Sequence, residues 1–166
     1  MHYRGLVDLA ADAAMGTRFD GVLPELEPYP HDLAHAYGEL LFHGPALQGI
    51  TAIEGVGERA MVVQLRSATP AQVDLPGPAF HTDPVVLDSV LQAVVLWVRH
   101  TRGASALPSY MGRYVQHAPL QGPLRCLIDL EPSETARGTF AARLIDAAGR
   151  VVATITDGQY TASEAL

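Results

Sequence analysis

The sequence predicts an α+β fold in which a curved antiparallel sheet wraps around one long buried helix. Residues 84–100 form a nearly all-apolar helical run, and a helix that is apolar on every face cannot lie on a surface. About five or six strand-like segments accompany it. Those after the helix follow one another without the crossover helices that parallel pairing needs. A sheet of this kind around one buried helix is the hotdog architecture.

Both ends of the predicted helix carry local signals. Asp83 can cap its N-terminus, and Pro84 occupies the first helical position, which proline favours. Gly103 is expected to end it, after basic residues that suit the negative end of a helix. Before the helix, strand residues flank the turn-like Gly55-Val56-Gly57; near the C-terminus, Asp146–Arg150 is expected to form a hairpin turn. The expected strands lie within residues 51–65, 109–120, 123–132, 138–147 and 150–162.

The first 36 residues are expected to stand apart from the main domain. Residues 2–9 could form a strand, and a proline-rich segment with no steady periodicity follows. A strand separated from its partners by a linker suggests the remaining edge of a preceding domain. We therefore expect a remnant strand and linker over residues 1–36 and one hotdog domain over residues 37–166.

Composition narrows the class of protein. The formal charge of −7 argues against nucleic acid or an anionic membrane as the main partner. The single cysteine, Cys126, lies in an alternating segment and is expected to be buried, which fits a reducing compartment. The start lacks a signal-peptide core, and the longest apolar run, residues 90–98, is too short to span a bilayer. We expect a cytoplasmic protein.

Two polar residues interrupt the apolar helix. Asp88 and Gln92 are four residues apart and so share one helical face. One interpretation is structural: the carboxylate is satisfied by backbone amides or by Gln92. The other is functional: an acid that lines a cleft and donates or accepts a proton. The spacing alone leaves both interpretations open.

Three motifs resemble polyketide synthase dehydratase domains. DPVVLDSVLQ (residues 83–92) is similar to the family's HPALLDAALQ/H, and YGELLFHGPALQGI (residues 37–50) to YGxxFxGPxFQ. LPSYMGRYV (residues 107–115) takes the place of an LPFSW-like segment. The family is a double hotdog whose first half supplies a histidine in HxxxGxxxxP and whose second half supplies an aspartate. This sequence contains no HxxxGxxxxP, so it resembles the C-terminal half, with a leaning toward iterative synthases of the enediyne or polyunsaturated fatty acid type.

The resemblance implies roles for individual residues. Asp88 would be the catalytic acid and Gln92 its orienting neighbour. Two departures, Asp83 in place of the motif histidine and a missing tryptophan in residues 109–114, concern the substrate tunnel rather than Asp88. The residues expected near the substrate are Tyr37, His43, Gly44, Pro45, His81 and Pro108.

The implied reaction is that of a 3-hydroxyacyl-[acyl-carrier-protein] dehydratase, a lyase. A base removes the α-proton while an acid protonates the departing hydroxyl. The substrate is carried on the phosphopantetheine of an acyl carrier protein, and no metal or redox cofactor is needed. His31 and His35 are four residues apart but lack a third ligand, so a zinc site is not expected. His43 and His81 are the histidines that this chain itself could offer, each more simply read as a loop or structural residue.

Three alternatives remain open. The chain could be a homodimeric hotdog thioesterase or hydratase, a non-catalytic hotdog that serves as scaffold or dimerisation element, or a cyclising domain of the product-template type. The expected partners of the chain are an acyl carrier protein and either an N-terminal hotdog or a second copy of the chain, and a homo-oligomer is expected. Alone, the chain is expected to be an incomplete enzyme because it lacks the matched histidine.

Overall fold

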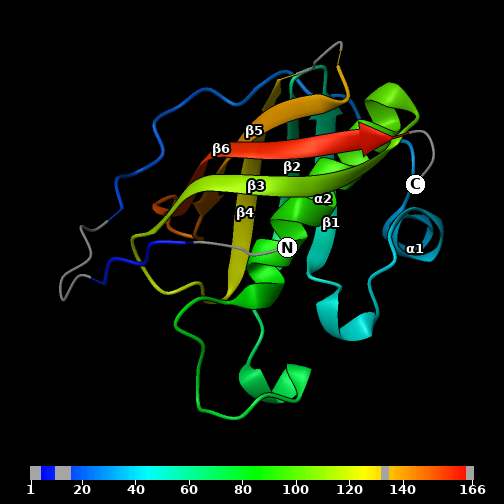
Figure 1. The fold of residues 1–166 in the computed structure, drawn as a ribbon. Helices are drawn as coiled ribbons and strands as arrows, with labels where there is room; N and C mark the ends of the chain where they lie inside the picture. The colour runs from blue at the N-terminus through cyan, green and yellow to red at the C-terminus, as the bar shows by residue number, and fades with distance from the viewer. Residues whose placement is uncertain (1–4, 10–15, 132–134, 164–166) are drawn as a thin grey trace.

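The computed structural model describes residues 5–9, 16–131 and 135–163 and has one antiparallel sheet within them. The strand order is β1-β2-β4-β5-β6-β3. The sheet is strongly twisted: β1, β2 and β4 run up the view of Figure 1, whereas β3, β5 and β6 run across it, with α2 on the face that they enclose. The predicted fold class is confirmed. The strands are β1 (Ile50–Gly57), β2 (Ala60–Arg66), β3 (Ser105–Gln116), β4 (Pro123–Glu131), β5 (Arg137–Ile145) and β6 (Val151–Ser163).

The central helix α2 (Pro84–Arg102) begins and ends where the sequence indicates. The Asp83 carboxylate accepts hydrogen bonds from the backbone nitrogens of Val85 and Val86 at 2.9 and 3.3 Å. Its other oxygen accepts from Ala68 N, so the same side chain anchors the preceding loop. Gly103 adopts a left-handed conformation (φ 62°) and closes the helix. Asp83 thus has a structural role at the position where the family motif has histidine.

The core lies between α2 and the sheet. Trp97 is fully buried, and its Nε1 donates a hydrogen bond to Gly57 O at 3.0 Å. Its ring packs edge-on against Tyr160 of β6, with ring centroids 6.4 Å apart. Cys126 is fully buried in β4, as predicted, and burial raises the pKa of its thiol. Trp97 therefore ties α2 to both halves of the curved sheet.

Four short helices lie in the connections. The segment before β1 folds into α1 (Leu33–His35), the π-helical turn η1 (Ala36–Leu40) and the 3₁₀ turn η2 (Pro45–Leu47), and η3 (Pro70–Val73) lies between β2 and α2. Asp32 begins this segment by accepting a hydrogen bond from His35 N at 2.8 Å. At its end, Leu41 N donates to Ala36 O at 2.9 Å, the five-residue spacing of a π turn. These turns bring residues 37–49 to the first half of α2.

Two details differ from the sequence-based expectations. Residues 5–9 form no strand and lie exposed, because no neighbouring strand pairs with them; residues 2–4 of that expected strand lie outside the described residues. The turn between β1 and β2 is at Glu58-Arg59, not at Gly55-Val56-Gly57. Gly57 is the last residue of β1, and a Cβ there would lie 2.6 Å from Glu25 O. That glycine serves the close approach of another segment rather than a turn.

The segment of residues 16–32 follows the outside of the sheet with little regular structure. It makes isolated bridges between Arg18 and Arg150 and between Glu27 and Val56. Within the part of the chain that the structure describes, no helix has the length and apolar character of a transmembrane span.

Candidate active site

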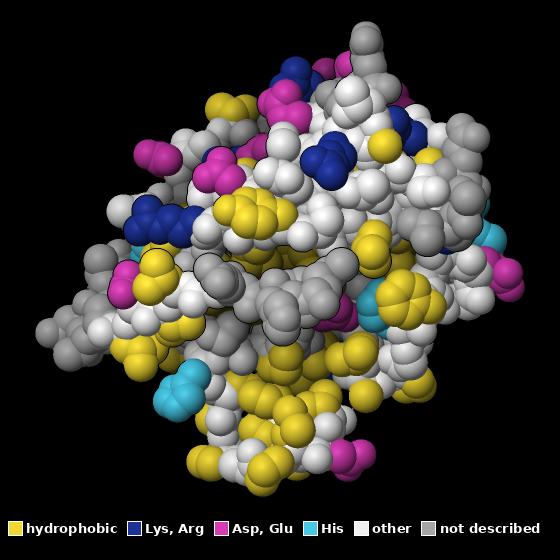
Figure 2. Space-filling view, in the orientation of Figure 1, with side chains coloured by type: hydrophobic (Ala, Val, Ile, Leu, Met, Phe, Trp, Pro, Cys, Tyr) yellow, Lys and Arg dark blue, Asp and Glu magenta, His cyan; other side chains and the backbone are white. Residues whose placement is uncertain are grey.

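Asp88 lies on a partly exposed strip in the first half of α2. Leu87, Asp88 and Leu91 are only partly buried, whereas most of the helix is inaccessible. The Asp88 side chain is 32% exposed. The prediction that α2 is buried on every face is therefore wrong along this strip, because the sheet does not close over it. Figure 2 shows hydrophobic side chains gathered over the lower part of the same view, where Figure 1 places the loop that leads into α2.

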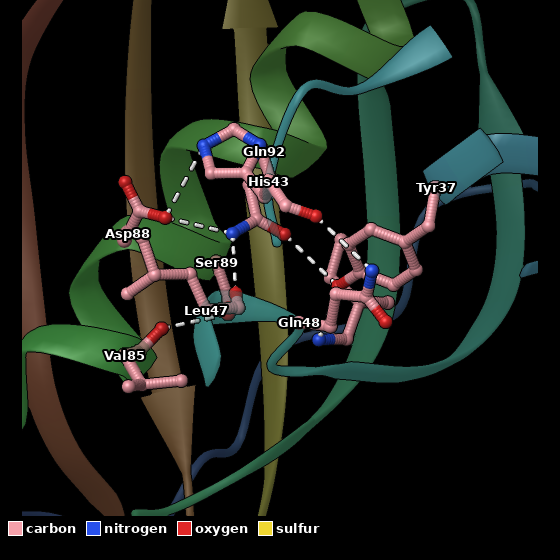
Figure 3. Close-up of polar contacts among 9 residues, drawn as sticks. Tyr37, His43, Leu47, Gln48, Val85, Asp88, Ser89 and Gln92 are labelled. Carbon is pink, nitrogen blue, oxygen red and sulfur yellow. Dashed lines mark hydrogen bonds and ion pairs between the residues drawn. The ribbon is translucent and has the colours of Figure 1, made fainter. Parts of the chain in front are cut away.

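Gln92 is almost fully buried, at 1% exposure, and both its amide nitrogen and its amide oxygen make hydrogen bonds inside the protein. Its Nε2 donates to Asp88 Oδ2 at 2.7 Å and to Leu47 O at 2.8 Å. Its Oε1 accepts a hydrogen bond from the Tyr37 hydroxyl at 2.9 Å, and that hydroxyl accepts one from Ile50 N at 2.9 Å. Figure 3 shows this chain of contacts running from Tyr37 to the Asp88 carboxylate. The amide orientation of Gln92 is thereby determined, with its donor side toward Asp88.

His43 completes the group. Its Nε2 lies 3.3 Å from Asp88 Oδ2, and its side chain is only 9% exposed. Its ring stacks on that of Phe42, with centroids 4.3 Å apart, and Gln48 Nε2 donates to the backbone oxygen of His43 at 3.0 Å. His43 Nδ1 is buried without a hydrogen-bond partner. The sequence identified His43 as a candidate but not its direct contact with Asp88.

A close backbone approach sets the position of the His43 loop. Gly49 packs directly on α2: a Cβ there would lie 2.1 Å from Ser89 Oγ and 2.9 Å from Val85 Cγ1. The Ser89 hydroxyl donates to Val85 O at 2.7 Å, which keeps this polar group satisfied in the core. Arg66 Nε, from β2, donates to Gln48 O at 3.0 Å on the other side of the loop. The loop is therefore held against the helix by hydrogen bonds and by the absence of a side chain at Gly49.

The structure brings together four of the residues that the sequence proposed: Tyr37, His43, Asp88 and Gln92. Gly44 and Pro45 lie in the loop between them, where Gly44 is extended and Pro45 begins η2. His81 and Pro108 do not join this group. His81 is exposed, with its carbonyl accepting from Gln116 Nε2 at 2.9 Å, and Pro108 pairs with Tyr160 in the sheet. The site also uses two backbone groups, Leu47 O and Ile50 N. The sequence could not indicate them, because every residue type other than proline offers both groups.

Burial affects the ionisation of Tyr37. Desolvation raises the pKa of its hydroxyl, an effect that the hydrogen bond from Ile50 N partly opposes. The hydroxyl is therefore protonated at neutral pH and remains a donor to Gln92. The arrangement presents a partly exposed carboxyl group with one oxygen held by the protein, which can exchange a proton with a molecule that approaches the open strip of α2.

Comparisons with known proteins identify the family. The family model described as the polyketide synthase dehydratase N-terminal domain matches residues 24–166. The chain belongs to the polyketide synthase dehydratase family. The match begins ahead of the domain boundary expected at residue 37. A component of the polyunsaturated fatty acid synthase from Thraustochytrium sp. (strain ATCC 26185 / S-3) is 33% identical over 122 residues, which are 71% of this chain and 4% of that protein.

Solved dehydratase structures share the hotdog fold of this polyketide synthase dehydratase chain. The dehydratase domain of RzxB from Pseudomonas fluorescens superposes with a TM-score of 0.65 at 19% identity, covering 89% of this chain and 54% of that one. GphF Dehydratase 1 superposes with a TM-score of 0.68 at 21% identity, and the match covers 85% of this chain and 53% of that one. The dehydratase domain of PpsC from Mycobacterium tuberculosis, in complex with C12:1-CoA, superposes with a TM-score of 0.63 at 23% identity. This match covers 82% of this chain and 56% of that one. The chain thus spans about half the length of these relatives.

Proposed function

We propose that this chain is the C-terminal hotdog of a polyketide synthase dehydratase and supplies its catalytic acid, Asp88. The substrate would be a 3-hydroxyacyl thioester on the phosphopantetheine of an acyl carrier protein. The observation that carries the proposal is the pairing of Asp88 with Gln92, at 2.7 Å, on the open strip of the central helix. The relative among polyunsaturated fatty acid synthases supports an iterative parent synthase.

The reaction needs a base and an acid on the same substrate. The base removes the proton from the α-carbon, the electron pair of that C–H bond forms the α,β double bond, and the C–O bond to the β-hydroxyl breaks. Asp88 gives its proton to the departing oxygen, so that water leaves instead of hydroxide. Gln92 holds the carboxyl group in position, because its own amide is fixed by Tyr37 and by Leu47 O. Neither step calls on a metal or a redox cofactor.

The base would come from a second hotdog. The 166-residue sequence contains no HxxxGxxxxP motif, and the solved dehydratases are nearly twice as long as the part that this chain matches. The only histidine that contacts Asp88 among the described residues, His43, has Nε2 on the Asp88 carboxylate and Nδ1 buried. Neither nitrogen is open to a substrate α-carbon. A carrier protein and a first hotdog are therefore the partners that this chemistry requires.

The experiment compares Asp88→Asn with the unaltered sequence in the complete dehydratase, that is, this chain together with the hotdog that supplies the histidine. Asparagine keeps the shape of the side chain but has no proton to give. Loss of the acid should lower turnover of a 3-hydroxyacyl-carrier-protein substrate about a hundred- to ten-thousand-fold. Gln92→Ala should cost less, because Gln92 orients the acid and transfers no proton.

Circular dichroism of each variant would serve as the folding control. A folded Asp88→Asn variant with near-normal turnover would show that the acid has been assigned to the wrong residue. Full activity of the isolated chain would instead favour a self-sufficient homodimer, one of the alternatives that the sequence leaves open.

A further inference from the structure

We propose that His43 is a positioning residue that holds Asp88 Oδ2 and so directs the transferable proton to Oδ1. This inference rests on the proposed role of Asp88 as the acid. It gives a function to a histidine that lies in the same hotdog as the aspartate, in the loop between η1 and η2.

The first argument is the unequal environment of the two carboxylate oxygens. Oδ2 faces two nitrogens, Gln92 Nε2 at 2.7 Å and His43 Nε2 at 3.3 Å. Among the described residues, no hydrogen bond or ion pair is made by Oδ1, which points away from both nitrogens in Figure 3. An oxygen that accepts from two N–H groups has little room for a proton of its own. The protonated acid should therefore carry its hydrogen on Oδ1, the oxygen that is free to meet a substrate.

The second argument concerns the tautomer of His43. The side chain is only 9% exposed, and Nδ1 has no partner. A buried N–H without an acceptor costs more than a buried lone pair without a donor, since the N–H loses a strong hydrogen bond to water. In the tautomer with hydrogen on Nε2, that hydrogen faces the Asp88 carboxylate, and the buried Nδ1 carries only a lone pair. A distance of 3.3 Å is long for such a bond, but catalytic hydrogen bonds often tighten when substrate binds.

The third argument is what the contact does during the reaction. After Asp88 gives up its proton, the carboxylate that remains accepts from both His43 and Gln92, and hydrogen bonds to a charged group are the stronger kind. Among the described residues, the ionisable group in contact with His43 is Asp88 from α2. The charges that act on Tyr37, the hydrogen-bond partner of Gln92, are those of Arg66 and Asp88. Tyr37 is kept neutral by burial. His43 would thus assist proton transfer without touching the substrate.

The test uses two variants of similar size in the complete dehydratase. His43→Gln keeps an N–H donor near the position of Nε2, whereas His43→Met keeps the volume without a donor. We expect kcat of the methionine variant to fall about 10- to 100-fold, the loss of one hydrogen bond to a charged group. The alkaline limb of its kcat–pH profile should move upward, because the acid releases its proton less readily without this donor. The glutamine variant should restore most of kcat and the original profile.

A second measurement does not depend on activity. The ¹⁵N shifts of the histidine side chains, with His43 assigned by its loss in His43→Gln, should report the tautomer with hydrogen on Nε2. A hydrogen on Nδ1 would overturn the inference even if the methionine variant failed to fold. So would a folded His43→Met variant whose kcat and pH profile match the original.

Failure of the inference can be told from failure of the proposed function. If Asp88→Asn is inactive while His43→Met behaves as the original, Asp88 is the acid and His43 is a structural neighbour. If Asp88→Asn is folded and active, both proposals fail together.

Discussion

The Tyr37 hydroxyl donates a hydrogen bond to Gln92 Oε1 at 2.9 Å and thereby connects the segment before β1 to the central helix. The Tyr37 hydroxyl oxygen also accepts a hydrogen bond from Ile50 N at 2.9 Å. Because Gln92 Oε1 is occupied by a donor, its Nε2 must face Asp88 and Leu47 O. A single phenol, distant in sequence from α2, thus determines which end of a buried amide meets the carboxylate.

Tyr37→Phe should therefore weaken both the fold and the site. The substitution leaves the Ile50 N–H and Gln92 Oε1 without their partner in a region where both residues are buried. Each unsatisfied buried group costs about 1–3 kcal/mol, so the free energy of unfolding should fall by about that amount or more. Denaturant unfolding measures it. Unchanged stability would mean that water replaces the hydroxyl and that this bond does not orient Gln92.

Gly49→Ala should be destabilising for a steric reason. The added Cβ would lie 2.1 Å from Ser89 Oγ and 3.2 Å from Val85 O, so the loop or the helix must shift. Overpacking of this kind costs about 1–3 kcal/mol. Gly38→Ala is the matched control, because a Cβ at Gly38 has no atom within 4 Å. Thermal unfolding should separate the two variants, and equal melting temperatures would contradict the close packing of the His43 loop on α2.

The parts of the fold that depend on local signals could be predicted from the sequence. Asp83 and Gly103 bound α2 as expected, since capping is decided by the few residues around each helix end. The strands after α2 follow from their alternating pattern. The turn after β1 could not be located in this way: Gly57 suggested a turn, but it is required by contact with Glu25 O, which comes from a distant segment.

The candidate site was only partly predictable, because some of its contacts join segments that are distant in the sequence. The four-residue spacing of Asp88 and Gln92 places them on one helical face in any helix. The contact of His43 with Asp88 depends on how the loop folds back onto α2, and no local pattern encodes that path. The hydrogen bond from Gln92 to Leu47 O could not be predicted, because every residue has a backbone oxygen and the sequence does not indicate which one will accept. Exposure of the strip at Asp88 depends on how far the sheet closes over the helix.

A pH dependence of stability is expected at the hairpin between β5 and β6. Hydrogen bonds from Arg150 N and the Arg150 side chain, together with one from Ala148 N, lower the pKa of Asp146 below its usual range, in spite of some desolvation. A group whose pKa is lowered by folding stabilises the native state above its unfolded-state pKa, near pH 4, and this contribution is lost as the pH falls through the folded-state pKa.

Asp146→Asn tests this, because asparagine keeps the acceptor oxygen for Ala148 N and Arg150 N but removes the charge and the second oxygen, which accepts from the Arg150 side chain. The unaltered chain should be more stable than the variant at pH 7 and at pH 5, and the difference should shrink below about pH 4. Urea unfolding at several pH values measures it. A difference that is as large at pH 3 as at pH 7 would show that the charge of Asp146 contributes nothing.

The last prediction concerns association of the isolated chain. Among the described residues, β3 pairs only with β6 and forms one end of the sheet. It is 12 residues long and carries two large exposed side chains, Leu107 and Tyr110, each 56% exposed. A long, apolar edge strand is a template for pairing with another strand. We expect a second copy of this hotdog to occupy this edge when no first hotdog is present, so sedimentation at micromolar concentration should give a dimer.

Tyr110→Glu should weaken that dimer, since a charge buried between two paired strands loses its hydration. Val22→Glu is the control: Val22 is 94% exposed but lies in the segment outside the sheet, so the dimer should persist. Equal weakening by both variants would point to a nonspecific effect of charge. A strict monomer for the original chain would show that β3 is protected without a partner, and the requirement for a second hotdog would then rest on the missing histidine alone.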